Sequence, residues 1–575
     1  MLRRALPIYA ALAILFCWPL FSVPGGFGIM DWDQHFFLYA AVAKSVLAFH
    51  QLPFWNPWYC GGNMLWQNPE VAVLSPVYLL ATVMPLPIAM KVNIALHFAT
   101  GLVGMHVLLT RRFGLTSWPL VTFLASVFAL SGGFAMHLGV GHATFLTFMY
   151  LPFVLYFVTG ACAAEHWRQG VRPALAAGGF MALSAWNGGI YPLVMNGVAL
   201  VVFGLSASVI RRNWRPIAFV ALSGLAGFTY AAPKLLPIAA VFADPTLVDS
   251  RADLREPDWV TWGEMKDALI NPNRPADWIG WFEYGNYVGP LAAFLFLGAF
   301  AYWLSTRPSR ERWLGISLTL AAIVLLLLAR GTFSHYAPYT LLRELPVFSS
   351  LRKPGRYSLI FVLFAAAATA EALRSALKGY TLSPGMRRIA GVVLVVATAD
   401  VVWHNRAELA GTMSEPPASL NVRLTERDPA PTIDTTSKGD GSNTAMIQGI
   451  TDNRDIVECH LLIGPPRAID ATQPIVWSDR NAQLSRISYS PNRIAVDVNT
   501  TDAARVFLNQ NYMNGWHASD GRLSVDTATG LANTTLPAGF QGTLTFTYTP
   551  PLFWIGLATM LGALAATAAI KKLGS

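Results

Sequence analysis

The chain has 575 residues, of which 54% are hydrophobic and only 13% charged, and its mean hydropathy is +0.43. This composition excludes a water-soluble globular protein, and the length excludes a single membrane span. The formal charge of +9 does not indicate nucleic acid binding, because Lys and Arg occur in short clusters between apolar segments. The sequence therefore predicts a polytopic α-helical membrane protein.

Apolar segments long enough to cross a bilayer recur along the chain, and we expect about twelve membrane helices. They lie near residues 5–24, 88–110, 117–135, 144–162, 173–189, 192–210, 216–241, 287–304, 313–329, 357–375, 388–403 and 550–570. The first segment follows Arg3 and Arg4 but has no small-residue cleavage site, so we expect a retained helix rather than a signal peptide.

Basic clusters occur at every second boundary of these segments, which predicts that both termini and the basic faces are cytoplasmic. The clusters are Arg3–Arg4, Arg111–Arg112, Arg168 with Arg172, Arg211–Arg212 with Arg215, Arg307 to Arg312, Arg374 to Arg388, and Lys571–Lys572. The longer loops then lie on the extracytoplasmic face, and we expect any chemistry on the same face.

The first external loop, residues 25–87, opens with GIMDWDQHFF, in which Asp31 and Asp33 stand at the exit of the first helix. The following segment, residues 34–50, has the composition of a helix lying in the membrane interface. Next come Trp55, Trp58, Tyr59 and Trp66, which we expect at the depth of the lipid headgroups. Taken residue by residue, this pattern also fits an aromatic belt beside two solvated acids.

Residues 404–549 change in character, because Thr, Asp, Asn and Ser replace Leu and Ala. Alternating stretches such as RISYSPNRIAVDVNT predict an extracytoplasmic β-rich domain, of sandwich or jelly-roll type. We therefore expect a membrane domain over 1–403, the β-rich domain over 404–549, and a last helix and cytoplasmic tail over 550–575. Tyr512, Gly515 and Trp516 are interpreted as core and turn residues of the β-rich domain.

The four cysteines add little to the functional prediction. Cys17 and Cys162 lie in or beside helices, whereas Cys60 and Cys459 both fall on the external side, where disulfides form. Nothing in their spacing brings Cys60 to Cys459, so we expect free thiols rather than a bridge. Zinc, haem, P-loop and dinucleotide motifs are absent from the sequence, which leaves ATP-driven transport without support.

Three separated motifs resemble the C-type (GT-C) membrane glycosyltransferases, and within them the YfhO-like bacterial branch. The first is Asp31 with Gln34 and His35, followed by PFWNPWYCGGN and QNPE. The second is SSLRKPGRYSL, which is similar to an Arg-x-Pro-x-Arg stretch entering a late helix. The third is NQNYMNGWHASDGRL with LPAGFQGTLTFTYTPPLFWIG, similar to the terminal β-domain of the branch and its last helix.

The resemblance implies transfer of a sugar from a polyprenyl-phosphate donor to an acceptor hydroxyl at the outer face of the bacterial inner membrane, with inversion. The implied partners are the lipid-linked donor, membrane lipids, and a glycan, lipid or protein acceptor of the envelope, with no nucleic acid.

An alcohol is a poor nucleophile, so such a reaction requires a carboxylate that accepts its proton. We predict Asp31 as this base, because it matches the acid that precedes Gln and His in the family. Asp33 is kept as an alternative base, metal ligand or acceptor contact. In an extended chain the two side chains would share one face, whereas in a helix they would not. Their proximity would raise the pKa of one of them.

A departing lipid phosphate requires fixed cations. Lys234, near the outer end of the 216–241 segment, is the first candidate, because an ionisable group within a span is costly unless it is paired. A snorkelling lysine, or one paired with Asp400, is the structural alternative. Arg352 and Arg356 are the next candidates, since the planar guanidinium matches phosphate oxygens.

Further candidate contacts to the sugar or acceptor are His35, His137 and His142, and, in the loop 242–286, Glu283 and Tyr284. Each of these side chains also fits an ordinary structural role. Carboxylates with a histidine are able to hold Mg²⁺ or Mn²⁺, but cationic side chains neutralise phosphate without a metal, so we predict no obligatory metal ion.

Two other classes of function fit a polytopic membrane protein of this kind. A transporter or flippase for lipid-linked saccharides predicts Gly/Pro-broken helices in related halves and no large external β-domain. A non-catalytic envelope assembly protein would use the β-rich domain for partners and leave Asp31 replaceable.

Overall fold

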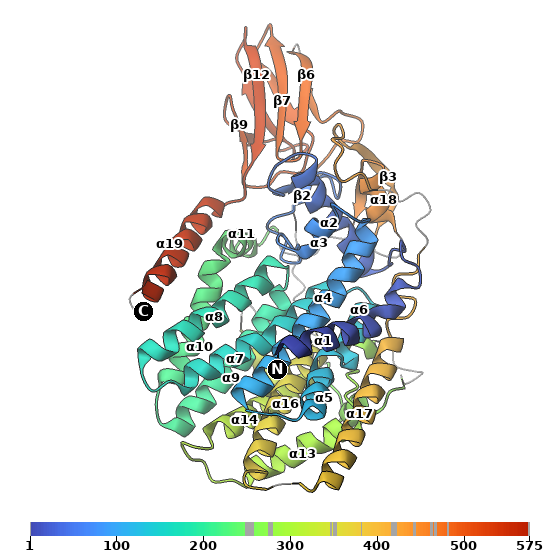
Figure 1. Ribbon diagram of the computed structural model, residues 1–575. Helices are drawn as coiled ribbons and strands as arrows, with labels where there is room; N and C mark the ends of the chain where they lie inside the picture. Colours follow the sequence, from blue (N-terminus) through green and yellow to red (C-terminus); the bar gives the residue numbers. More distant parts are fainter. Residues whose placement is uncertain are drawn as a thin grey trace.

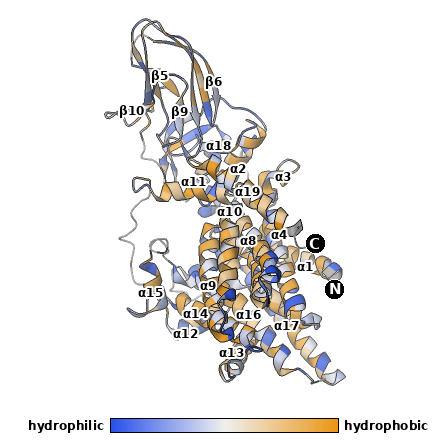
Figure 2. Cartoon of the chain, turned by 90° about the vertical axis from the view of Figure 1, so that its left-hand side faces the viewer, coloured by the Kyte–Doolittle hydropathy of each residue, from blue (hydrophilic) through white to orange (hydrophobic). Residues whose placement is uncertain are grey.

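The computed structural model places a β-rich module at one end of a helical body (Figure 1). The structure describes residues 2–247, 258–273, 280–345, 348, 353–380, 382–415, 422–440, 444–459, 464, 468–479 and 482–572. Figure 2 shows that the helices of the body are coloured mostly as hydrophobic, whereas polar and apolar residues are mixed in the module. Both the membrane-protein class and the β-rich C-terminal region that the sequence predicts are therefore confirmed.

Each of the apolar segments expected from the sequence falls on one or more helices of the body. These helices are α1 (Leu2–Cys17), α4 (Leu86–Val107), α5 (Trp118–Ala129), α6 (Gly132–Gly139), α7 (Leu151–Ala163), α8 (Trp167–Trp186), α9 (Ile190–Arg211), α10 (Arg215–Tyr230), α11 (Ala232–Phe242), α13 (Pro290–Leu304), α14 (Trp313–Arg330), α16 (Tyr357–Ala376), α17 (Pro384–Ala407) and α19 (Phe553–Lys572). Shorter helices connect them, namely η1 (Trp18–Phe21), η2 (Leu108–Arg112), η3 (Ala143–Tyr150), α12 (Trp262–Ile270), η5 (Trp281–Glu283), α15 (Pro338–Arg343) and η6 (Pro354–Arg356).

By length and composition, seven helical segments within the described residues are able to cross a membrane. They are Leu86–Arg112, Trp118–Gly139, Ala143–Ala163, Ile190–Arg211, Trp313–Arg330, Pro354–Ala376 and Phe553–Ile570. Helices α1 and α13 contribute shorter apolar stretches, Ala5–Phe21 and Pro290–Leu304. A count of about twelve crossings therefore stays a prediction.

The segment 216–241 is not the single straight helix that its hydropathy indicates. Helices α10 and α11 meet at Ala231 with a bend of 90°, so the pair is either one broken span or a re-entrant turn, and it raises the count of spans to at most eight. Pro233 in the first turn of α11 lacks the N–H that would continue the α10 hydrogen bonds, and its ring disfavours a continuous helix. Lys234 lies just after this bend.

The first external loop folds into α2 (Asp31–Leu47), the short strands β1 (Trp55–Asn56) and β2 (Asn63–Met64), and α3 (Pro76–Leu80). The expectation that residues 34–50 lie in the membrane interface is wrong, since 13 of the 17 residues of α2 are buried within the protein. The helix packs against α18 (Ala445–Thr451) of the C-terminal region. An amphipathic surface helix and a helix buried between two parts of a protein are alike in composition.

The C-terminal module contains two four-stranded antiparallel sheets, with strand orders β10-β11-β8-β5 and β6-β7-β12-β9. Their inward side chains, among them Val496, Val506 and Phe546, belong to one apolar core, as expected for a β-sandwich. A separate parallel pair is formed by β3 and β4. The strands are β3 (Thr432–Gly439), β4 (Arg454–Cys459), β5 (Val476–Ser478), β6 (Ala482–Ser490), β7 (Arg493–Thr500), β8 (Ala504–Leu508), β9 (Trp516–Ala518), β10 (Ser524–Val525), β11 (Ala532–Leu536) and β12 (Gln541–Tyr548).

The tryptophans of the first loop lie under this module and are buried by protein rather than by lipid, while their expected headgroup depth stays a prediction. Trp55 is fully buried, and its ring centroid lies 5.2 Å from that of Trp516 and 4.6 Å from that of Tyr548. Trp66 packs in the same way against Phe553 at the start of α19. Tryptophan suits both a membrane interface and a protein interface, so composition alone does not separate them. Trp516 is a core residue of the sandwich, as predicted.

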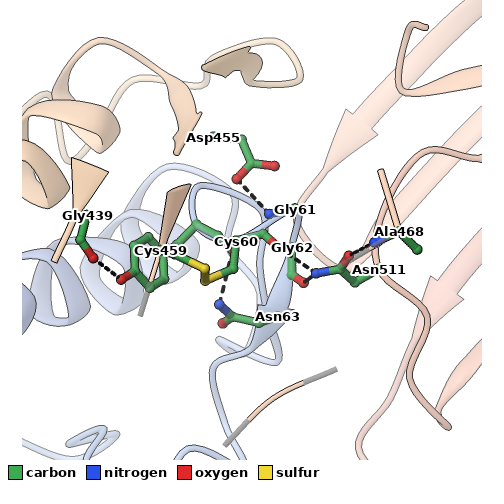
Figure 3. The surroundings of a disulfide bond; sticks show 10 residues. Cys60, Gly61, Gly62, Asn63, Gly439, Asp455, Cys459, Ala468 and Asn511 are labelled. Carbon is green, nitrogen blue, oxygen red and sulfur yellow. Dashed lines mark hydrogen bonds between the residues drawn. A yellow bond between two sulfur atoms is a disulfide. The ribbon is translucent and has the colours of Figure 1, made fainter. Parts of the chain in front are cut away.

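A disulfide between Cys60 and Cys459 joins the first loop to strand β4 (Figure 3), so the expectation of two free thiols is wrong. The two Cα atoms are 5.5 Å apart although the residues are separated by 399 positions. Beside the bridge, the Asn511 amide donates to the carbonyl oxygens of Cys60 and Gly62. The loop and the C-terminal module thus form one packed unit.

Removal of the bridge by the double substitution Cys60→Ser and Cys459→Ser should destabilise this unit by about 2–5 kcal/mol, because the unfolded chain regains freedom. Thermal unfolding in detergent measures the loss. Alkylation of the denatured wild-type protein should label only Cys17 and Cys162 before reduction and all four cysteines after it. Four labels without reductant would contradict the bridge.

A buried acid beside the disulfide makes the stability of this unit depend on pH. Asp455 is 2% exposed, its Oδ1 accepts a hydrogen bond from the Gly61 N–H at 3.0 Å, and burial raises its pKa to about 7 against the opposing effect of that bond. Because the pKa is raised on folding, the contribution of Asp455 to stability is fully present below pH ~4 and is lost as the pH rises through 7.

The substitution Asp455→Asn should therefore raise the free energy of unfolding at pH 8 by at least about 1 kcal/mol and change it little at pH 4. An asparagine oxygen still accepts from Gly61, while the buried charge is gone. Chemical unfolding at the two pH values measures the difference, and an equal effect at both would contradict the assignment.

Candidate active site at the first turn of helix α2

The chain enters α2 through a sharp turn at Met30, whose φ of 58° lies in the left-handed region that is unfavourable for a side chain of this size. The helix begins at Asp31, so Asp31 and Asp33 point to different sides of it, as they must in a helix. The Asp31 side chain is 54% exposed, whereas Asp33 is fully buried. Of the two acids, only Asp31 is accessible to a substrate.

Asp33 is held by the C-terminal module. Its two carboxylate oxygens accept hydrogen bonds from the backbone N–H groups of Met446 and Ile447, each at 2.9 Å. These N–H groups open helix α18, where the helix dipole favours a negative charge. Burial raises the pKa of Asp33 to about 7, and the two hydrogen bonds oppose this rise. The geometry makes Asp33 an anchor between α2 and the module.

Asp31 faces the turn between α6 and η3. Its Oδ2 atom lies 3.4 Å from the Nε2 atom of His142. Loss of water around the carboxyl raises the pKa of Asp31, the positive charge of Arg356 lowers it, and the negative charge of Glu283 raises it. A carboxyl whose pKa is moved towards neutrality is suited to accept a proton at physiological pH.

The turn that carries His142 is fixed to the first turn of α2. The indole Nε1–H of Trp32 donates to the Leu138 carbonyl at 2.7 Å. Gly141 has φ 99°, and a Cβ added there would lie 2.5 Å from the backbone nitrogen of Trp32 and 2.7 Å from the Cβ of Asp31. Only glycine allows both this backbone conformation and this close approach.

An ion pair between Arg356 and Glu283 lies close enough to act on the pKa of Asp31. Nε of Arg356 donates to Oε2 of Glu283 at 2.8 Å, and Nη2 donates to Oε1 at 2.6 Å. Burial alone would raise the pKa of Glu283, but the charge of Arg356 and its hydrogen bonds bring it down to about 2. The guanidinium carbon also lies 5.2 Å from the ring centroid of Phe145.

Two further predicted residues remain, Tyr284 from the loop 242–286 and Arg352 from the Arg-x-Pro-x-Arg stretch. The Tyr284 hydroxyl donates to Asp258, which also pairs with Lys353 at 2.9 Å. Tyr284 is therefore a buried, hydrogen-bonded tyrosine next to Glu283. Arg352 falls outside the described residues.

Lys234 is fully buried and holds the first loop in place. Its Nζ atom donates to the carbonyl oxygens of Trp66 at 2.5 Å and Asn68 at 2.8 Å. The alternative pairing of Lys234 with Asp400 is wrong. Asp400 instead accepts a hydrogen bond from the Tyr287 hydroxyl at 2.6 Å and pairs with His404 at 3.0 Å. The partners of Lys234 are backbone carbonyls, so no acidic residue in the sequence could have indicated them.

The structure thus brings five of the predicted site residues together, namely Asp31, His137, His142, Glu283 and Arg356, and places His35 as a buried neighbour. Burial lowers the pKa of His35 to about 4, so it is neutral at pH 7. Reasoning from the sequence missed Trp32, Gly141 and the rings of Phe145 and Phe282. The only signal for them was their position next to Asp31, His142 and Glu283 in the chain.

Within the part of the chain that the structure describes, no group of three or more His, Cys, Asp or Glu side chains is arranged to hold a metal ion. No residue is therefore assigned as a metal ligand here. The cluster offers a half-exposed carboxyl, two imidazoles and a guanidinium, which together are able to accept a proton and to contact a phosphate.

No family model matches this chain, and neither does the sequence of any curated protein. Among solved structures, the chain is similar to the cryo-EM structure of the arabinofuranosyltransferase AftD from Mycobacteria, with a TM-score of 0.53 at 15% identity over 95% of this chain. The match covers 40% of that chain, so the present protein spans about two fifths of its length.

A mutant of the same enzyme, R1389S class 2, matches with a TM-score of 0.44 at 16% identity over 70% of this chain and 27% of that one. At these identities the likeness concerns the fold alone. The match with a TM-score of 0.53 supports the coarse architecture that the sequence predicts, a multi-pass membrane helical protein with a C-terminal β-rich region.

Proposed function

We propose that the protein is a membrane glycosyltransferase that moves a sugar from a polyprenyl-phosphate donor to an acceptor hydroxyl, with Asp31 as the general base. The observation that carries the proposal is the different exposure of the two neighbouring acids. Asp31 is open to an incoming hydroxyl, whereas both oxygens of Asp33 are occupied by backbone N–H groups. The GT-C fold and the three sequence motifs support the same reaction class.

In this reaction the acceptor oxygen attacks the anomeric carbon of the sugar from the face opposite the phosphate. The new C–O bond forms as the bond to the phosphate oxygen breaks, and the electron pair leaves with the lipid phosphate. The hydroxyl proton passes to the free oxygen of Asp31. Displacement from the opposite face inverts the configuration of the anomeric carbon.

Arg356 is the described cation best placed for the leaving phosphate. Its pair with Glu283 uses Nε and Nη2, so Nη1 remains to meet a phosphate oxygen. Arg352, four positions earlier, is proposed as a second phosphate contact, and Tyr284 as a neighbour of the sugar. We assign Lys234 to positioning the loop 53–70 rather than to the donor, because its ammonium is bonded to the carbonyls of that loop.

The proposal includes the finer features that the sequence predicts. The chain belongs to the YfhO-like branch, lies in a bacterial inner membrane with about twelve crossings and cytoplasmic termini, and acts on the outer face. The acceptor is a glycan, lipid or protein of the envelope, and the β-rich module over residues 404–549 stands beside the base.

The experiment uses the full chain in lipid nanodiscs with a panel of synthetic polyprenyl-phosphate sugars and an envelope extract as acceptor. Release of free polyprenyl phosphate is measured by mass spectrometry. One donor should be consumed in proportion to the amount of protein. If no donor is consumed, and in sealed proteoliposomes a labelled lipid-linked saccharide crosses the bilayer, the protein is a flippase and the proposal is wrong.

A further inference from the structure

Two histidines stand behind Asp31 in direct contact with each other. The Nδ1 atoms of His137 and His142 are 2.8 Å apart, and the rings are stacked with an interplanar angle of 29°. A nitrogen-to-nitrogen contact of this length requires one proton between the two atoms, supplied by one ring and accepted by the other. The two imidazoles are therefore coupled, and the tautomer of one determines that of the other.

The surroundings keep His142 neutral. Burial lowers the pKa of its ring far below the usual value, the neighbours His137, Arg356 and His35 lower it further, and Glu283 opposes them. Asp31 is the charged group that lies against the Nε2 side of the ring, with its Oδ2 atom 3.4 Å away. A neutral imidazole carries one N–H only, so the question is which nitrogen of His142 bears the proton.

The negative charge of Asp31 favours one of the two tautomers of His142. If His142 donated from Nδ1 to His137, its Nε2 lone pair would face the Asp31 carboxylate, which is repulsive. If His137 donates, Nε2 of His142 carries the proton and points it at Oδ2 of Asp31, 3.4 Å away. This distance is long for a hydrogen bond, as is common in active sites before substrate binds.

We propose that His137 and His142 are positioning residues that lock Asp31 in its ionised, substrate-facing orientation. His137 fixes the Nε2–H tautomer of His142, and that N–H stabilises the Asp31 carboxylate through Oδ2. The other oxygen, Oδ1, then stays free to accept the proton of the acceptor hydroxyl. This role rests on the proposed function, because it acts on the base of that reaction.

Packing holds the pair in this arrangement. The ring of Phe145 lies 4.5 Å from that of His137 and 5.3 Å from that of His142, measured between centroids. The ring of Phe282 also packs there, with its centroid 5.9 Å from that of His142. These aromatic contacts restrict rotation of the imidazoles, and Gly141 keeps the turn against Asp31.

The test is the pH profile of kcat/KM for His142→Phe, His142→Gln and His137→Leu in the full chain. Activity requires ionised Asp31, so it rises with pH through the pKa of that group. Loss of the N–H donor in His142→Phe should raise this pKa and move the acidic limb upward by about one pH unit, with kcat about tenfold lower and KM for the donor within twofold.

His142→Gln retains an N–H donor and should restore most of the wild-type limb, while His137→Leu should shift it in the same direction as His142→Phe by a smaller amount. His517→Phe changes an exposed residue of strand β9, serves as the matched control and should leave the profile unchanged. A structural role alone would lower the amount of folded protein without moving the limb.

The two proposals fail in different ways. If the wild-type protein consumes no lipid-phosphate sugar, the proposed function is wrong. If it does so, depends on Asp31, and keeps the same acidic limb in His142→Phe, then only the positioning role of the histidines is overturned. An equal shift in His142→Phe and His142→Gln would also contradict it.

Discussion

Substitution Asp31→Asn should reduce turnover of the lipid-linked sugar by about 10²- to 10⁴-fold, the usual contribution of a general base. An amide has the same shape as the carboxylate but does not accept the hydroxyl proton. The half-exposed position of Asp31 predicts that the fold is unaffected, so the midpoint of thermal unfolding should remain close to that of the wild type. The rate is measured as release of polyprenyl phosphate in nanodiscs.

Two other Asp→Asn substitutions distinguish loss of the general base from loss of structure. Asp497→Asn changes a half-buried acid of strand β7, which accepts a hydrogen bond from Thr543, and should leave the rate unchanged. Asp33→Asn replaces one of the oxygens that receive the α18 N–H groups by an amide nitrogen that also donates, so it should lower the unfolding midpoint. A normal rate in Asp31→Asn would remove the enzyme mechanism.

Arg356→Met should be the most destabilising single change at the site, at about 3–5 kcal/mol. It removes both hydrogen bonds to Glu283 and leaves that carboxylate charged and only 7% exposed. The low pKa of Glu283, about 2, depends on this pair, so a lone Glu283 would be forced towards its neutral form. The free energy of unfolding at pH 7 measures the effect.

A double variant distinguishes the structural role of the pair from its proposed contact with phosphate. Arg356→Gln combined with Glu283→Gln removes both charges and allows the two amides to bond to each other, which should recover most of the stability lost in Arg356→Met. If Arg356 also binds the leaving phosphate, the double variant should remain at least about tenfold slower than the wild type. Recovery of both stability and rate would assign Arg356 to structure alone.

Helix positions were predictable because a bilayer demands long apolar stretches, and each predicted stretch falls on helices of the body. The sandwich was predictable from alternation in β7 and β12. The bend between α10 and α11 was not predictable, because hydropathy averaged over a window does not register the single Pro233 at the bend. Burial of Trp55 by protein was not predictable either, because an aromatic side chain suits any interface with one apolar side.

The sequence predicted which residues belong to the cluster around Asp31, but not which of them contact each other. Asp31, His142 and Arg356 lie in three separate segments, and only the fold shows that they meet. The roles of Asp33 and Cys60 depended on partners more than 390 positions away, as the 399-residue span of the disulfide illustrates. Local spacing carries no information about such partners.

Helix α2 has a consequence for biosynthesis. Its first turn is completed by Met446 and Ile447, which bond to Asp33, and its loop is crosslinked to Cys459. A ribosome that has made the N-terminal three quarters of the chain has therefore produced every proposed catalytic side chain without the support that orients them. Nascent molecules should therefore stay inert until residues 445–459 have been made and have folded against α2.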